Sequence, residues 1–374
     1  MPKSLYSLLI VGRVSDSVTR HLLKAKRVKL KLETSFTYQH KIELLVRLHL
    51  NSNCRVTLPL TRPTCVNPQR GMALLTVLFI LAIASIALVA MSSSRQLDIR
   101  RTENLLRSAQ GMDTVYGLES WAGKTLTEDA QKNKSDSYEE AWARVLPETA
   151  VPGGSMTAAI EDLQGRFNLN NLLVDGEPSG LDIERLRQLM ISLKINPKPI
   201  DAILDWLDTD SKIRYPNGAE DETYMDKATP YRSANRLFSD VSELLLVHGI
   251  SRDNYQRLLP YIYVADTYAP INVNTADKLI LHSLVANFPD KNLDAITHAL
   301  EQKPFSQLED FLKHEAIAPL GITKPGLSVN SGLFLLNSRI QIGKIILEFA
   351  SQLKRTENGE VTVLKRQRRS PDHG

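Results

Sequence analysis

The chain contains an uncharged apolar run from Met72 to Met91. It is twenty residues long and has no Asp, Glu, Lys, Arg or His. A helix of that length rises about 30 Å, which matches the hydrocarbon core of a bilayer, and it satisfies its own backbone in lipid. The run therefore predicts a transmembrane helix over residues 72–91. The alternative is a core helix of a soluble protein, although such helices usually keep a polar stripe.

Beyond this run, hydrophobic residues recur at the three- and four-residue spacing of an amphipathic helix. Leu97, Ile99, Leu105 and Leu106 alternate there with charged residues, and neither Pro nor Gly interrupts residues 72–110. The pattern therefore predicts one long helix, whose first part is soluble in lipid and whose later part packs on a globular domain.

The middle of the chain predicts short helices and the end predicts strands. Helices are expected at 181–193, 200–207, 241–248, 276–284, 293–302 and 308–314, and strands at 156–163, 333–342, 344–352 and 361–364. Asn358-Gly359 is a hairpin signal between the last two strands, because this pair favours a type I′ turn.

Charge is distributed unevenly along the chain. The whole chain carries a net charge of +4, but its first seventy residues hold thirteen Lys or Arg against three acidic residues. Both cysteines, Cys54 and Cys65, also lie in this leading segment. Residues 1–65 are interpreted as an overcalled translation start, with Val66 as the true start. A genuine basic arm attracted to nucleic acid or anionic lipid is the open alternative.

The start of the apolar run resembles the processing site of type IV pilin-like precursors. A short basic leader ends at Gly71, directly before the apolar run at Met72. The resemblance implies that a prepilin peptidase cleaves between Gly71 and Met72, and that Met72 is then N-methylated. A secretory signal, which is cut after its apolar region, is the alternative, and the Ala-rich stretch 84–90 keeps it open.

One departure from the general pilin pattern is informative. Most pilins carry Glu at the fifth mature position, which here is Thr76. In that family the Glu neutralises the amino terminus of an adjacent subunit, and a buried carboxylate without a partner is costly. A subunit with nothing stacked above it can lack the Glu. Thr76 therefore indicates the end of a filament, and the substitution resembles the minor pseudopilin K family of type II secretion.

Further motifs follow the order of that family. They are Asp162–Asn171 (DLQGRFNLNN), Asp205–Asp210 (DWLDTD), Gly218–Asp221, Pro230–Arg232 with Asn235, Ser242–Leu244 and Ile271–Ala276. Each motif is weak alone, but their order over most of the chain is specific. The resemblance implies an α+β fold, in which a long pilin-like N-terminal helix packs on an antiparallel sheet and a large, mostly helical (SAM-like) domain is inserted between strands.

The expected divisions of the chain follow from this resemblance. They are an upstream leader segment 1–71, the transmembrane part 72–91, the amphipathic part of the helix 92–125, the start of the pilin-like domain 126–170, the inserted helical domain 171–327 with an acidic loop 205–226, the C-terminal strands 328–365 and a basic tail 366–374.

The acidic loop 205–226 is the main candidate for a metal site. Its acidic residues are Asp205, Asp208, Asp210, Glu220, Asp221, Glu222 and Asp226. Hard oxygen ligands with flexible spacing suit Ca²⁺, and the spacing is not that of an EF-hand. The resemblance implies calcium ligands at Asp208, Asp210, Glu220 and Asp221. A solvated acidic turn beside Lys212 and Arg214 is the alternative.

The resemblance implies a minor pseudopilin that caps the tip of the type II secretion pseudopilus and initiates its assembly for protein export across the outer membrane. The expected partners are H-, I- and J-type minor pseudopilins, the major pseudopilin, the prepilin peptidase and the inner-membrane assembly platform, with exported substrates and the outer-membrane secretin as further contacts. The expected location is the bacterial inner membrane, as a single-pass protein with its globular domain in the periplasm. Catalysis is not expected, since no phosphate-cradling loop or Gly-x-Ser-x-Gly motif is present.

A second function class remains open. The segment Ile271–Ala276, with Leu279 and Leu284 after it, resembles a helix-hairpin-helix, which would indicate a membrane-tethered DNA-binding protein of a DNA-uptake pilus. Such hairpins bind phosphates with flanking basic residues. Lys278 and Lys291 are the only basic residues near it, and several acidic residues oppose it. A protein–protein scaffold with no nucleic acid is the favoured interpretation.

Overall fold

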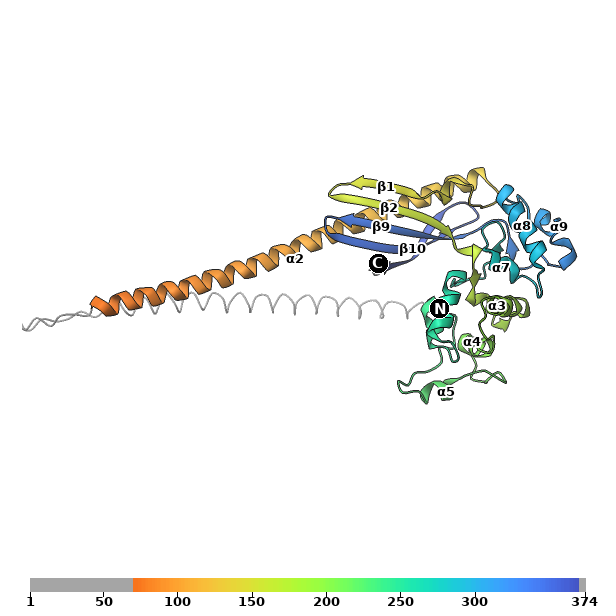
Figure 1. Ribbon diagram of the computed structural model, residues 1–374, viewed down its shortest axis with the longest axis horizontal. Coiled ribbons are helices and arrows are strands. Elements are labelled where there is room, and N and C mark those ends of the chain that lie inside the picture. The colour runs from red at the N-terminus through yellow and green to blue at the C-terminus, as the bar shows by residue number, and fades with distance from the viewer. Residues whose placement is uncertain (1–69, 370–374) are drawn as a thin grey trace, which may run out of the picture. The chain divides into compact units, whose positions relative to one another are not determined.

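The computed structural model describes residues 70–369 (Figure 1). The predictions about the translation start at Val66 and the basic leading segment lie outside the described residues, as does the end of the predicted tail, 370–374.

The first described element is α2 (Arg70–Lys132), a single helix of 63 residues. It continues the predicted long helix without a break. Side chains of its apolar run are exposed, with Met72 at 65% and Phe79 at 66% of full accessibility. Among residues 70–369, α2 is the helix long and apolar enough to cross a membrane. This exposure does not fit the core-helix alternative, since a core helix would be buried.

The later part of α2 packs on the sheet. Val115, Leu118, Ala122 and Leu126 recur at helical spacing and are almost fully buried, which places one apolar stripe of the helix on the sheet. They share a hydrophobic core with Phe334, Leu336, Ile340, Leu347 and Leu353. Gly111 permits the close approach, because a Cβ there would run into the side chain of Leu347.

The sheet has five antiparallel strands in the order β1-β2-β9-β10-β11 (Figure 1). These are β1 (Leu146–Val151), β2 (Gly154–Asp162), β9 (Leu333–Ile342), β10 (Ile345–Arg355) and β11 (Val361–Arg369). Although β2 and β9 are far apart in sequence, they are neighbours, with Asp162 opposite Phe334. The whole segment between them is therefore an insertion into the sheet, as the predicted fold class requires.

Two features of the sheet differ from the predictions. The strand β1 was missed, because its burial pattern is irregular and Pro147 and Glu148 give it little strand character. The predicted tail 366–374 is also wrong in its first part, because β11 continues to Arg369. Arg366 of this tail binds Glu119 on α2, and Lys365 directly before the tail lies 2.7 Å from Asp240, whereas Arg368 and Arg369 are exposed.

Helices are the main regular secondary structure of the insertion, which has its own hydrophobic core. Its helices are α3 (Gly180–Ser192), α4 (Ile200–Leu207), α5 (Asp221–Met225), α6 (Arg252–Leu258), α7 (Lys278–His282), α8 (Asp290–Gln302) and α9 (Leu308–Lys313), and its short strands pair as β3 (Phe167–Asn168) with β6 (Ile262–Tyr263), β4 (Leu173–Val174) with β5 (Glu177–Pro178), and β7 (Ile271–Asn272) with β8 (Leu327–Ser328). The helix expected at 241–248 is a 3₁₀ turn over Val241–Leu246. The core of the insertion already includes Phe167 and Leu169, which the sequence analysis assigned to the preceding segment.

Buried amides explain the asparagine-rich motif. Asn170 donates to the carbonyls of Phe238 (3.0 Å) and Ala265 (2.9 Å) and accepts from the Phe238 N–H. Asn171 bonds both backbone groups of Ala269 in the same manner. Buried backbone groups need such partners. The motif therefore holds distant loops of the insertion together and has a structural role.

Candidate functional site

The acidic loop between α4 and α5 is shaped by Asp205. This buried carboxylate accepts the backbone N–H of Arg214 at 3.2 Å and that of Ala219 at 2.8 Å. Burial is the main cause that raises the pKa of Asp205. Gly218 is required at the same place, because a Cβ there would overlap the Asp205 carboxylate and the backbone of Arg214. Asp205 therefore stabilises the fold of the loop through hydrogen bonds in its interior.

Three other carboxylates meet in the loop. Asp208, Asp210 and Glu220 each offer one oxygen, and these oxygens all lie within 4.8 Å of one another. Asp208 and Glu220 are buried, at 6% and 4% exposure, while Asp210 is exposed. A solvated acidic turn does not fit the burial of two of these groups.

Several oxygens at this loop lack hydrogen-bond partners. Both carboxylate oxygens of Glu220 and the Oδ1 of Asp208 are buried without a donor. Orphaned buried polar atoms are rare in folded proteins, because each one costs free energy. Burial first, and then the charges of neighbouring carboxylates, raise the pKa of Glu220 to about 7. The guanidinium of Arg214 binds the other oxygen of Asp208 at 2.7 Å and so offsets part of the charge.

The predicted ligand Asp221 is not part of this group. Its carboxylate accepts the backbone N–H of Ser233 at 2.8 Å and lies 3.8 Å from Arg232. The structure therefore brings together Asp208, Asp210 and Glu220 of the four residues proposed, and gives Asp221 a different partner.

Two further oxygens beside the loop that could act as metal ligands were not predicted from the sequence. Asn235 donates its amide to the Asp210 carbonyl at 2.9 Å, while its Oδ1 is buried and unpartnered. The hydroxyl of Ser233 is also buried without a partner. The positive φ of 45° at Asn235 shows a backbone held in an uncommon conformation. Asn235 was noted only as part of a family motif, and nothing in the local pattern indicated that its segment folds back onto the loop.

Taken together, these donors fit a hard divalent cation. Carboxylate, amide and hydroxyl oxygens at irregular spacing are the ligands that Ca²⁺ accepts. The orphaned oxygens of Glu220, Asp208 and Asn235 are the groups that such an ion would satisfy.

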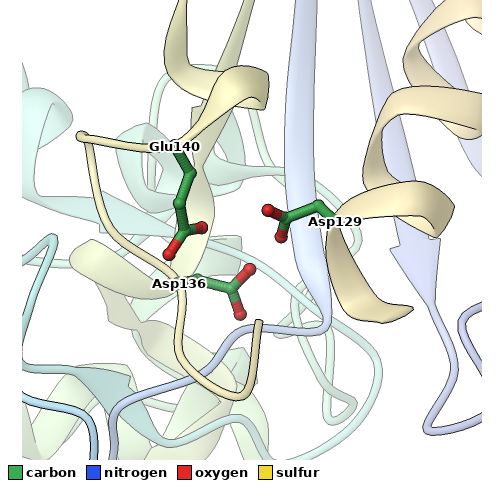
Figure 2. Close-up of side chains that lie close together, drawn as sticks. All are labelled: Asp129, Asp136 and Glu140. Atoms are coloured by element: carbon green, nitrogen blue, oxygen red, sulfur yellow. The ribbon is translucent and has the colours of Figure 1, made fainter. Parts of the chain in front are cut away.

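A second acidic cluster has a different character. Asp129, Asp136 and Glu140 also offer oxygens within 4.8 Å of one another (Figure 2). Here Arg355 already supplies a positive charge, at 3.2 Å from Asp129 and 2.5 Å from Asp136. None of these carboxylate oxygens is left without a donor. The cluster therefore does not offer the unsatisfied ligands found in the acidic loop.

The residues of the expected processing site begin α2. Thr76 donates its hydroxyl to the carbonyl of Ala73 at 2.9 Å. The hydroxyl is thus satisfied within the helix, which suits a polar side chain inside an apolar segment.

The fold places the chain in a known class and family. A long helix packed on an antiparallel sheet, with a head inserted between two neighbouring strands, defines a pilin-like minor pseudopilin. The family model for type II secretion system protein K matches residues 165–267. The chain is 33% identical over 80% of its length to one such protein, and it therefore belongs to the type II secretion system protein K family.

Individual relatives cover most of the chain. Type II secretion system protein K of Pseudomonas aeruginosa is 33% identical over 311 residues, which are 80% of this chain and 92% of the relative. The Aeromonas hydrophila protein is 32% identical over 81% of this chain and 98% of its own length. The solved GspK-GspI-GspJ complex from enterotoxigenic Escherichia coli contains a chain that matches with a TM-score of 0.63 and 25% identity, over 72% of this chain and 99% of that one.

The DNA-binding alternative is not favoured by these relatives. Lys278, one of its few basic residues, lies 2.5 Å from Asp294 on α8. That pairing leaves α7 with less free positive charge for phosphates. The chain is a minor pseudopilin of type II secretion.

Proposed function

We propose that this protein is the tip subunit of the type II secretion pseudopilus and starts its assembly. The observation that carries the proposal is the large head inserted between β2 and β9. The chain beyond the C-terminal end of α2 contacts this head, since Tyr138 donates to the carbonyl of Thr275 at 3.2 Å. A further subunit stacked on that end would meet the head, so the filament ends at this protein.

Thr76 supports the same position in the filament. A shaft subunit needs a carboxylate near its start to neutralise a neighbouring amino terminus, and an unpaired buried carboxylate is costly. Thr76 carries no charge, and its hydroxyl is already bonded within α2. The residue suits a subunit that has no neighbour above it.

In this proposal, the exposed apolar side chains of residues 72–91 anchor the protein in the membrane. The prepilin peptidase cleaves between Gly71 and Met72, Met72 is N-methylated, and the head lies in the periplasm. The released helix then packs beside the helices of other minor pseudopilins in the inner membrane.

The solved relative supports the choice of partners, because it is bound to GspI and GspJ. We extend this to I-, J- and H-type minor pseudopilins for the present chain. The major pseudopilin and the assembly platform contact it during growth, and exported substrates and the outer-membrane secretin contact its head.

The acidic loop binds calcium in this proposal. Asp208, Asp210 and Glu220 hold the ion, and Asn235, whose amide donates to the Asp210 carbonyl, offers a further oxygen that has no partner in the fold. The ion neutralises carboxylates that otherwise repel one another, and so fixes the loop between α4 and α5.

A head-deletion variant tests the tip position. Because Asp162 and Phe334 are opposite each other in the β2–β9 ladder, a two-residue Asn-Gly turn can replace residues 163–333. The sheet keeps its separate core with α2. We expect this variant to be processed and inserted normally but to abolish secretion, because the cap is gone. A reporter-secretion assay measures this, with the mature N-terminus as the control for processing. Undiminished secretion would contradict the proposal.

A further inference from the structure

The carboxylates of Asp129, Asp136 and Glu140 form a cluster that we name the acidic joint (Figure 2). Asp129 lies near the C-terminal end of α2, and the other two residues lie in the segment that follows it. Arg355 of β10 binds Asp129 and Asp136. The joint therefore ties the end of the long helix to the sheet.

The same segment also contacts the inserted head. The backbone N–H of Asp136 donates to the Val329 carbonyl at 2.8 Å, and the Asp136 carboxylate accepts from the Ser331 N–H at 2.7 Å. Asn272 of the insertion donates to the Asp136 carbonyl at 3.1 Å. Movement of this short segment would thus alter how α2, the sheet and the head are held together.

Charge in the joint is not balanced. Three carboxylates face one guanidinium, and Arg355 binds only two of them. The partners of Glu140 are neutral: the indole N–H of Trp142 donates to it at 2.7 Å and the hydroxyl of Ser137 at 3.4 Å. Carboxylates whose oxygens lie within 4.8 Å of one another cannot all ionise without a cost in free energy. Retention of one proton lowers this cost.

The other ionisable groups around the joint do not remove this imbalance. Asp162 of β2 is fully buried and adds a further carboxylate beside Asp136. Lys134 and Glu357, one of each sign, line the adjoining cavity of about 400 Å³ together with Arg355. Trp142 is completely buried, so water does not reach the indole side of Glu140 freely.

We propose that Glu140 of the acidic joint retains a proton in the folded protein, and that loss of this proton loosens the segment 133–143 between α2 and the head. The device is proton-linked, and it does not depend on calcium binding or on the position of the subunit in a filament.

The expected pH dependence follows from the folded state. Burial is the largest cause that raises the pKa of Glu140 from 4.5 to about 7 and that of Asp136 from 3.8 to about 6. The folded chain therefore binds more protons than the unfolded chain between about pH 4 and pH 7. The stability that the joint contributes is greatest at the acidic end of this range and falls as the pH rises through 7.

Hydrogen exchange of the full chain in detergent micelles tests this device, with rates corrected for the intrinsic effect of pH. We expect protection of residues 133–143 to fall at least about tenfold between pH 5.5 and pH 8. The Glu140→Gln variant keeps the hydrogen bond from Trp142 but has no proton to lose at residue 140, so most of the pH dependence of the protection should be lost. Glu139→Gln, at an exposed neighbouring residue, is the matched control and should behave like the wild type.

Two results would overturn the proposal. One is a Glu140→Gln variant that retains the pH dependence of the wild type, and the other is a wild type whose protection does not change. The second measurement decides the matter even if the variant does not fold. The measurement follows hydrogen exchange at residues 133–143 only. Titration of Glu220, which lies in the acidic loop, therefore does not account for a change in their protection.

Discussion

A Gly71→Ala chain is expected to remain uncleaved in the inner membrane and to abolish secretion. We expect the peptidase to require the glycine, which has no side chain to obstruct a close approach to the backbone, so the leader should stay attached to Met72. The uncut chain then cannot pack among the apolar helices of its partners in the filament, because its charged leader would be buried between them. Mass spectrometry of the membrane-bound chain measures the cut, and a secreted reporter measures the consequence.

The control for this experiment is Met72→Leu, which keeps both the glycine and an apolar first residue. It should be cleaved and should support secretion. A Gly71→Ala chain that matures normally would remove the proposed junction, and with it the numbering that places Thr76 at the fifth mature position.

The double substitution Asp208→Asn with Glu220→Gln is expected to weaken calcium binding by at least about a hundredfold. Each change removes the charge of a proposed ligand, and charge and ligand number set the affinity of calcium sites. In the wild type, calcium at a hundred times its dissociation constant stabilises the folded state by about 2.7 kcal/mol, so melting should shift upward on addition of calcium. The double variant should show neither the shift nor a calorimetric signal.

Asp226→Asn is the matched control, since Asp226 is an exposed acidic residue of the same loop outside the carboxylate group. It should bind calcium as the wild type does. Without calcium, the pKa of Glu220 near 7 predicts that the wild type loses stability as the pH rises through 7. Equal calcium heat in the wild type and the double variant would exclude this site and leave the secretion role untouched.

The hydrophobic pattern predicted the large elements well. The uncharged run and the spacing beyond it give a helix that the structure extends to Lys132. The strands β9 and β10 were found because Ile, Phe and Leu alternate there. Such periodic signals are local and need no knowledge of the tertiary fold.

Elements whose character comes from distant partners were harder to predict. Most of β11 has the composition of a solvated tail, and it is a strand because β10 pairs with it and because Arg366 meets Glu119 on α2. The short β1 offers no clean alternation and depends on β2.

The candidate site shows the same limit. A run of acidic residues indicated hard-cation chemistry, and three of the four expected ligands do meet. The segment after α5 folds back onto the loop. As a result, Asp221 accepts a hydrogen bond from Ser233, and Asn235 lies beside Asp210. The acidic joint could not be found from sequence spacing, because Arg355 lies more than two hundred residues from its partners.

The position of this subunit in the pseudopilus is the most direct test of the account. An epitope placed at Gly176, in the exposed turn between β4 and β5, can be labelled with gold on isolated pseudopili. The account predicts a single label at one end of each filament. Labels spaced along the shaft would contradict it, because a protein with this head and without the carboxylate at residue 76 would then be an ordinary shaft subunit.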